Sequence, residues 1–173
     1  MLAEYKQDLP IFFSVYVTSM KRSEKLIMFA ATGFGAGAIP FAPGTFGSVV
    51  GVGCAFLVSG LGPAWAIGVL VVVTGVAVWI SDRAEKILGK TDPGCIVIDE
   101  IAGMMVAMLG LPFTFWHAVA GFAAFRVFDI IKPFPIRKVE TLFPGGAGIV
   151  ADDLLAGVAA NLAVRVLFLF FAA

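Results

Sequence analysis

The chain has 173 residues, of which 60% are hydrophobic and only 14% are charged, and its mean hydropathy is +1.00. About a quarter of the residues in a typical soluble domain are charged, so this composition excludes an ordinary soluble domain and favours a compact membrane protein. The formal net charge of zero argues against a basic nucleic-acid-binding protein. Cys54 and Cys95 form no CxxC pattern, which argues against a disulfide or zinc framework.

The N-terminal segment, residues 1–24, differs from the rest of the chain. Glu4, Lys6 and Asp8 mix charges where a cleaved signal peptide has a basic region, and the apolar run that follows is short. We expect a tail or an interfacial segment here, with a short strand as an open alternative. Residues 25–173 are predicted to form one membrane-embedded domain.

Two long stretches without charge follow, at residues 26–81 and 101–125. Each is long enough to supply membrane helices, and Gly and Pro at 60–63 and 110–112 favour turns over continued helix. The sequence therefore predicts an all-α, polytopic membrane helix bundle with about five transmembrane helices. Their expected bounds are 45–59, 64–80, 98–109, 114–130 and 153–171, with a further helical turn at 25–31.

Charge placement predicts the orientation of this bundle. If the helices alternate in direction, the charged connections 82–100 and 126–153 lie on the same side as the N-terminal region. The many basic residues on that side place it in the cytoplasm, with the C-terminus on the opposite side. Arg165, inside the last helix, is the exception, and we expect it to snorkel outward or to pair within the bundle.

The acidic residues gather on the same predicted face, at the level of the lipid head groups. This arrangement favours an enzyme that acts on phospholipid head groups from the cytoplasm. A small cation transporter or channel subunit is the alternative, although such proteins usually carry polar groups near the membrane midplane.

The first motif is Pro43-Gly44-Thr45-Phe46-Gly47-Ser48, at the start of the first membrane helix. The hydroxyls of Thr45 and Ser48 would lie near a helix N-terminus, where free N–H groups attract phosphate, so both are candidate phosphate-binding residues. The alternative is a helix cap with small residues for helix packing. Gly47-x₃-Gly51 would suit such packing within one chain or between two chains, which leaves the oligomeric state open.

The second motif is the pair Asp99-Glu100. Two adjacent carboxylates with apolar residues on both sides are costly at a membrane boundary, which favours a functional role. The alternative is that they favour a helix N-terminus through its dipole.

The third motif contains Arg126, Asp129 and Lys132, spaced i, i+3 and i+6, which form one polar stripe on a helix. The helix is expected to end at Lys132 because Pro133 follows. The two cations can bind phosphate oxygens beside the acid. An interfacial salt bridge with a snorkelling lysine is the alternative.

The fourth motif runs from Gly145 to Asp153. A glycine-rich turn is expected to lead into Asp152 and Asp153, which would open the last helix. Glycine-rich backbone beside adjacent acids suits metal and phosphate binding together, whereas helix capping is the alternative.

Together these motifs bring five carboxylates to one membrane face. Such a cluster is costly without a counter-charge, and Mg²⁺ prefers oxygen ligands and often works with substrate phosphates. We therefore predict metal-assisted phosphoryl transfer, with Arg126 and Lys132 holding the phosphate. The candidate catalytic and metal-binding residues are Asp99, Glu100, Asp129, Asp152 and Asp153.

Four blocks that carry these motifs, 42–48, 98–103, 125–135 and 145–157, occur in the order typical of one family. At these residues the chain resembles the phosphatidylglycerophosphatase A family. The resemblance implies Mg²⁺-dependent hydrolysis of phosphatidylglycerophosphate to phosphatidylglycerol, with a phospholipid partner, in the bacterial inner membrane. Phe46 and Met104 stand where tryptophan is common in that family.

Overall fold

The computed structural model describes residues 20–172, so most of the predicted N-terminal segment lies outside the described residues. The described part is helical and contains no strand, as the all-α prediction expected. Its elements are α3 (Arg22–Ala31), the 3₁₀ helix η1 (Ala36–Ala38), α4 (Pro43–Ser59), α5 (Pro63–Leu88), α6 (Ile98–Met108), α7 (Phe115–Ile131), α8 (Ile136–Leu142) and α9 (Gly146–Ala172).

The five long predicted helices correspond to α4, α5, α6, α7 and α9, and Gly/Pro turns separate α4 from α5 and α6 from α7. Pro43 and Pro63 each stand in the first turn of a helix, where a missing N–H costs nothing. The α5 helix continues to Leu88, through charged residues that we had expected in a connection. The short helix α8 was not predicted.

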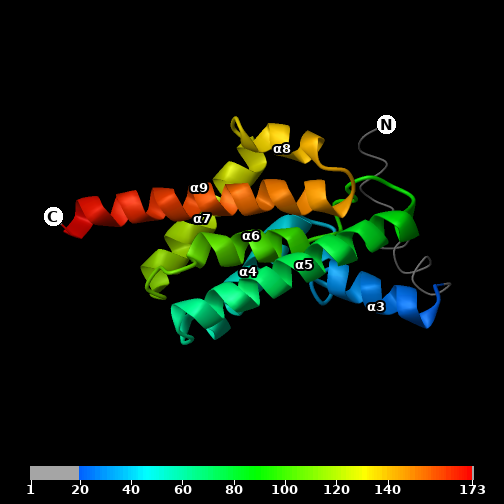
Figure 1. Ribbon diagram of the computed structural model, residues 1–173, viewed down its shortest axis with the longest axis horizontal. Helices are drawn as coiled ribbons and strands as arrows, with labels where there is room; N and C mark the ends of the chain where they lie inside the picture. The colour runs from blue at the N-terminus through cyan, green and yellow to red at the C-terminus, as the bar shows by residue number, and fades with distance from the viewer. Residues whose placement is uncertain (1–19, 173) are drawn as a thin grey trace.

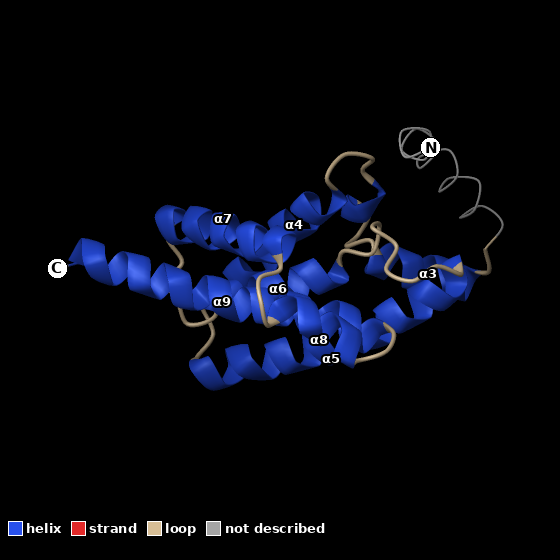
Figure 2. Ribbon diagram, turned by 90° about the horizontal axis from the view of Figure 1, so that it is seen from above, coloured by secondary structure: helices blue, strands red, loops and turns tan. Residues whose placement is uncertain are grey.

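The α6 helix lies at the centre of the bundle (Figures 1 and 2), in contact with α4, α5, α7 and α9. Nine of its eleven residues are buried, including all three of its methionines, at positions 104, 105 and 108. Burial on all sides suits a helix that is apolar after its first turn. At about 16 Å, α6 is also too short to cross a membrane by itself.

Glycines on α4 allow α6 to approach closely. A Cβ atom at Gly47 would lie 2.6 Å from the Cβ of Val97, and one at Gly51 would lie 2.7 Å from the Cβ of Met104. The Gly47-x₃-Gly51 face that we had expected to pack within or between chains therefore packs within this chain.

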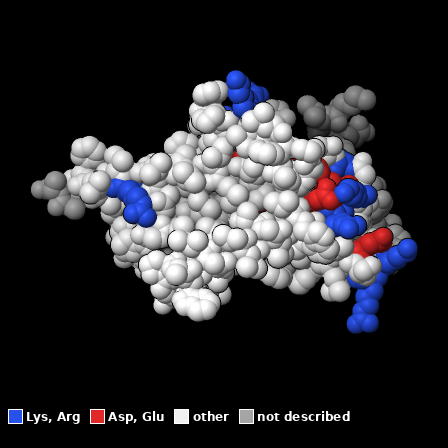
Figure 3. Space-filling model, in the orientation of Figure 1, with Lys and Arg blue, Asp and Glu red and all other residues white. Residues whose placement is uncertain are grey.

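Within residues 20–172, two helices are long and apolar enough to cross a membrane, Pro63–Leu88 and Gly146–Phe170 within α9, and α4 is a shorter apolar helix. Large apolar side chains such as Trp65, Trp116 and Phe170 lie on the outer surface. Charged side chains gather at the end of the molecule where α3 and the C-terminal part of α5 lie, and much of the remaining surface in this view is uncharged (Figure 3).

Candidate active site

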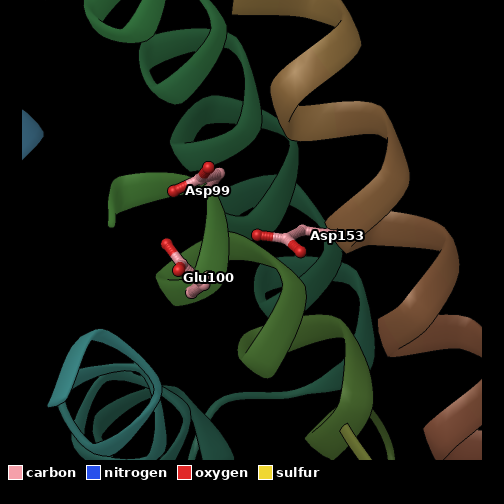
Figure 4. A group of neighbouring side chains, drawn as sticks. All are labelled: Asp99, Glu100 and Asp153. Carbon is pink, nitrogen blue, oxygen red and sulfur yellow. The ribbon is translucent and has the colours of Figure 1, made fainter. Parts of the chain in front are cut away.

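Three carboxylates meet at the charged end of α6 and α9. Asp99 and Glu100 stand in the first turn of α6, and Asp153 points from α9 toward them (Figure 4). Each side chain offers an oxygen, and these oxygens all lie within 4.8 Å of one another. Asp99 and Asp153 are buried and Glu100 is half-buried. The acidic motifs at 99–100 and 152–153, about 50 residues apart in the chain, thus form one group that could hold a metal ion.

The position of Asp152 and Asp153 differs from our expectation. The last helix begins at Gly146, so the two aspartates are its seventh and eighth residues and do not cap its N-terminus. The glycines had predicted a turn, but Gly146 serves close helix packing: a Cβ atom there would lie 2.3 Å from the carbonyl oxygen of Val78 on α5. Among the glycines of this motif, only Gly145, with φ of +62°, has a left-handed backbone conformation.

The hydrogen-bonding capacity of the buried acids is not fully met by the described part of the chain. Asp99 Oδ1 and Glu100 Oε2 are buried and make no hydrogen bond there. The like charges of Asp153 and Asp129 act on Glu100, so repulsion between carboxylates adds to the cost of its burial. Unpaired buried carboxylates are costly. A divalent cation that prefers oxygen ligands would offset both the cost of burying these charges and the repulsion between them. The donor set therefore fits a hard cation.

Arg126 links this group to α4. Its Nη1 lies 2.6 Å from Asp129 Oδ2 and donates a hydrogen bond of 3.3 Å to Ser48 Oγ, while Ser48 donates to the carbonyl oxygen of Gly44. A Cβ atom at Gly44 would lie only 2.3 Å from Glu100 Oε1. The N-terminus of α4 therefore packs directly on the site. Arg126 Nε is buried and makes no hydrogen bond to the described residues, so one donor of the guanidinium is unused.

The two hydroxyl residues of the first motif occupy different positions. Ser48 is fully buried and orients Arg126, whereas Thr45 is half-buried in the first turn of α4 and contacts none of the acids through a hydrogen bond. Neither side chain caps α4, so the capping alternative is wrong. The structure joins Ser48, and not Thr45, to the acidic group.

Lys132 also lies at the site, where it contacts α9. The α7 helix ends just before it, as predicted, and Lys132 adopts φ of +44° as the C-terminal cap. Its Nζ forms an ion pair with Asp152 Oδ2 on α9. Asp152 is almost fully buried, whereas the Lys132 side chain remains 28% exposed and lines the same cavity as the acids.

All five predicted carboxylates line one cavity of about 160 Å³. Asp92, which the sequence reasoning missed, also lines it. The sequence feature that could have indicated it is an acid in the Gly/Pro-containing connection 91–94, seven residues before Asp99. The backbone N–H of Asp92 donates to Glu85 Oε1 at 2.7 Å. The lining residues are Asp92, Gly94, Ile96, Asp99, Glu100, Asp129, Lys132, Ile149, Asp152 and Asp153.

In this helical bundle, carboxylates surround a small cavity, and arginine and lysine lie beside them. These features define a class: proteins suited to metal-assisted chemistry on a phosphate group. Residues 29–168 match the family described as phosphatidylglycerophosphatase A. The chain belongs to this family, as the resemblance of its motifs had predicted.

Curated relatives cover most of the chain. A Bacteroides thetaiotaomicron protein, provisionally named a phosphatidylinositol-3-phosphatase, is 40% identical over 147 residues, which are 80% of this chain and 91% of the relative. Phosphatidylglycerophosphatase A of Escherichia coli is 40% identical over 74% of this chain and 75% of its own length. The Haemophilus influenzae protein of the same name is 36% identical over 78% and 83%. No solved structure matches the chain.

Proposed function

We propose that this protein is a lipid phosphatase that hydrolyses phosphatidylglycerophosphate to phosphatidylglycerol and phosphate. The observation that carries the proposal is the acidic cavity, in which Asp99, Glu100 and Asp153 offer three oxygens within 4.8 Å of one another. Membership of the phosphatidylglycerophosphatase A family supports it. A cation transporter is not supported, since the named relatives are phosphatases.

In this proposal Asp99, Glu100 and Asp153 hold Mg²⁺, which would polarise the phosphoryl group. Arg126 and Lys132 bind the phosphate oxygens, and both already lie beside the acids, paired with Asp129 and Asp152. Those pairs hold the two cations in place before the substrate arrives, so little reorganisation is needed. As the water oxygen bonds to phosphorus and the phosphorus–oxygen bond to the glycerol breaks, Asp129 or Asp152 can accept the proton of the water and pass it to the departing glycerol oxygen. Thr45, half-buried at the start of α4, remains a candidate for an outer contact with the phosphate.

We also propose that the bundle spans the bacterial inner membrane with the acidic cavity facing the cytoplasm. In this arrangement α4, α5, α7 and α9 contact lipid, and α6 is the fifth helix, enclosed by them. The apolar outer surface and the gathering of charge at one end support this placement. The phosphate group of a lipid would then reach the cavity at the level where head groups lie.

Phosphatidylinositol 3-phosphate is the second candidate substrate, because one relative of equal identity carries that name. The cavity of about 160 Å³ is smaller than the roughly 300–1,000 Å³ of pockets that enclose a whole small ligand. It therefore suits a phosphoryl group with its cation, while the glycerol or inositol stays outside. The cavity alone does not favour one of these two lipids.

The test is phosphate release by the purified full-length chain in detergent with added lipid. Phosphatidylglycerophosphate and phosphatidylinositol 3-phosphate are assayed side by side, with Mg²⁺ and with EDTA, next to the Asp153→Asn variant. We expect release from phosphatidylglycerophosphate that needs both Mg²⁺ and Asp153. Preference for the inositol lipid would reassign the substrate, and release that persists in EDTA and in Asp153→Asn would contradict the proposed site.

A further inference from the structure

The C-terminal end of α6 depends on a side chain from another helix. The last carbonyl groups of any α-helix lack an intrahelical N–H partner and need another donor. Asn161 on α9 supplies it. Its Nδ2 donates to the carbonyl oxygens of Val106 at 3.3 Å, Ala107 at 2.9 Å and Leu109 at 2.9 Å.

Arg165, one helical turn further along α9, completes this contact. Its Nε donates to Asn161 Oδ1 at 2.7 Å, and its Nη2 donates to the carbonyl oxygen of Leu109 at 3.0 Å. Because Oδ1 accepts from the guanidinium, the amide nitrogen is directed to the α6 carbonyls. Of the two outcomes that we had expected for Arg165, pairing within the bundle is the one that the structure shows.

The Asn161–Arg165 contact belongs to a regular register between α6 and α9. The two helices run parallel, since both begin at the acidic cavity. Three pairs, each 54 residues apart in sequence, follow one another at four-residue steps: Asp99 with Asp153, Gly103 with Gly157, and Ala107 with Asn161. In the middle pair the backbones touch, because a Cβ atom at Gly157 would lie 2.3 Å from the carbonyl oxygen of Gly103.

We propose that Asn161 and Arg165 are positioning residues that fix this register and thereby set the relative placement of the carboxylates at the other end. The proposal rests on the metal-dependent function proposed above. A slip of one residue would move α6 by about 1.5 Å along its axis and by roughly 100° around it. Metal–ligand distances tolerate only about ±0.2 Å, so such a slip would separate Asp99 and Glu100 from Asp153 as ligands of one ion.

The experiment measures Mn²⁺ binding to the full-length protein in detergent by electron paramagnetic resonance, which needs no turnover. The main variant is Asn161→Leu, which keeps a similar volume but removes the amide donor. We expect its Kd for Mn²⁺ to rise at least tenfold at a temperature well below its Tm, measured by circular dichroism. The control is Phe168→Ala, which removes a ring stack on His117 of α7, 3.9 Å between centroids, at the same end of α9. The control should keep the wild-type Kd.

The outcomes separate this inference from the proposed function. Wild-type protein that binds no Mn²⁺ would overturn the metal site and this inference with it. Equal Kd values for the wild type and folded Asn161→Leu would overturn the inference alone, because a merely structural amide changes Tm and not affinity. If Asn161→Leu does not fold, Arg165→Ala decides the matter: it retains Asn161 and should weaken Mn²⁺ binding about threefold, and an unchanged Kd would overturn the inference.

Discussion

Gly103 of α6 and Gly157 of α9 meet backbone to backbone, such that a Cβ atom on Gly157 would lie 2.3 Å from the Gly103 carbonyl oxygen. No side chain can relieve this approach by changing its rotamer, because the neighbouring atom is part of the backbone. The close packing of the two helices that carry Asp99 and Asp153 therefore depends on glycine at position 157.

Gly157→Ala should push the two helices apart. Overpacking of this kind costs about 1–3 kcal/mol in soluble cores, so we expect a lower Tm and weaker Mn²⁺ binding. Gly75→Ala on α5 is the matched control, since a Cβ atom there meets nothing within 4 Å. Thermal melts and metal titrations of both variants measure the effect. A Gly157→Ala protein that behaves like Gly75→Ala would show that the helices can separate without harm to the site.

Asp153→Asn should weaken Mn²⁺ binding and reduce phosphate release on the order of 10²-fold, because it removes a charged oxygen from the group of three. Asp82→Asn is the matched control, since Asp82 lies on the surface of α5 in a salt bridge with Lys86 of 2.6 Å. An exposed pair of this kind contributes little to stability, and this variant should keep full activity. Equal losses in both variants would mean that the total negative charge at this end of the protein matters, rather than the group formed by Asp99, Glu100 and Asp153.

Arg126 forms an ion pair with Asp129 and donates a hydrogen bond to Ser48. The ammonium group of a lysine lacks the planar fork of the guanidinium and cannot make both contacts in a fixed geometry. Arg126→Lys should therefore reduce kcat/KM about 10²-fold. Ser48→Ala removes the hydrogen bond from Ser48 to Gly44 and the one that orients Arg126. Only the second touches the site, and at about 1 kcal/mol its loss should lower kcat/KM about fivefold. Steady-state kinetics of the two variants give the ranking. A larger loss in Ser48→Ala than in Arg126→Lys would show that the serine hydroxyl itself contacts the substrate.

Lys132→Ala leaves the buried Asp152 carboxylate without its ion pair. Loss of one partner of a buried polar group costs about 1–3 kcal/mol, so the unfolding midpoint should fall. Adding Asp152→Asn to Lys132→Ala should restore part of that stability without restoring activity, because the phosphate would still lack the ammonium group. Denaturation in detergent and phosphate release, measured on the same samples, separate these two effects. Activity recovered in the double variant would argue against phosphate binding by Lys132.

How far the sequence predicts this site depends on the kind of signal. Acids such as Asp99 and Asp129 border charge-free stretches, and this position is what brings them to one end of the bundle. The start of α9 was misplaced because glycine favours turns in general, while Gly146 serves close helix packing. Asn161 gave no signal, since a single polar residue in an apolar helix does not reveal which carbonyl groups, more than 50 residues away, it will contact.

The choice of cation gives a final prediction. Mg²⁺ requires about six oxygen ligands at 2.0–2.1 Å, whereas Ca²⁺ takes six to eight at 2.3–2.6 Å and tolerates irregular geometry. In the proposed site, Mg²⁺ would complete its shell with water and a phosphoryl oxygen beside carboxylates that line a cavity of about 160 Å³. EDTA should abolish phosphate release, Mg²⁺ or Mn²⁺ should restore it, and Ca²⁺ should compete for the site without supporting turnover. Calcium titrated against the Mn²⁺ resonance signal measures occupancy, and phosphate release from the same mixtures measures turnover. Full activity with Ca²⁺ would mean that the site is wider than its cavity indicates, and that a larger set of oxygens, including that of Asp92, surrounds the ion.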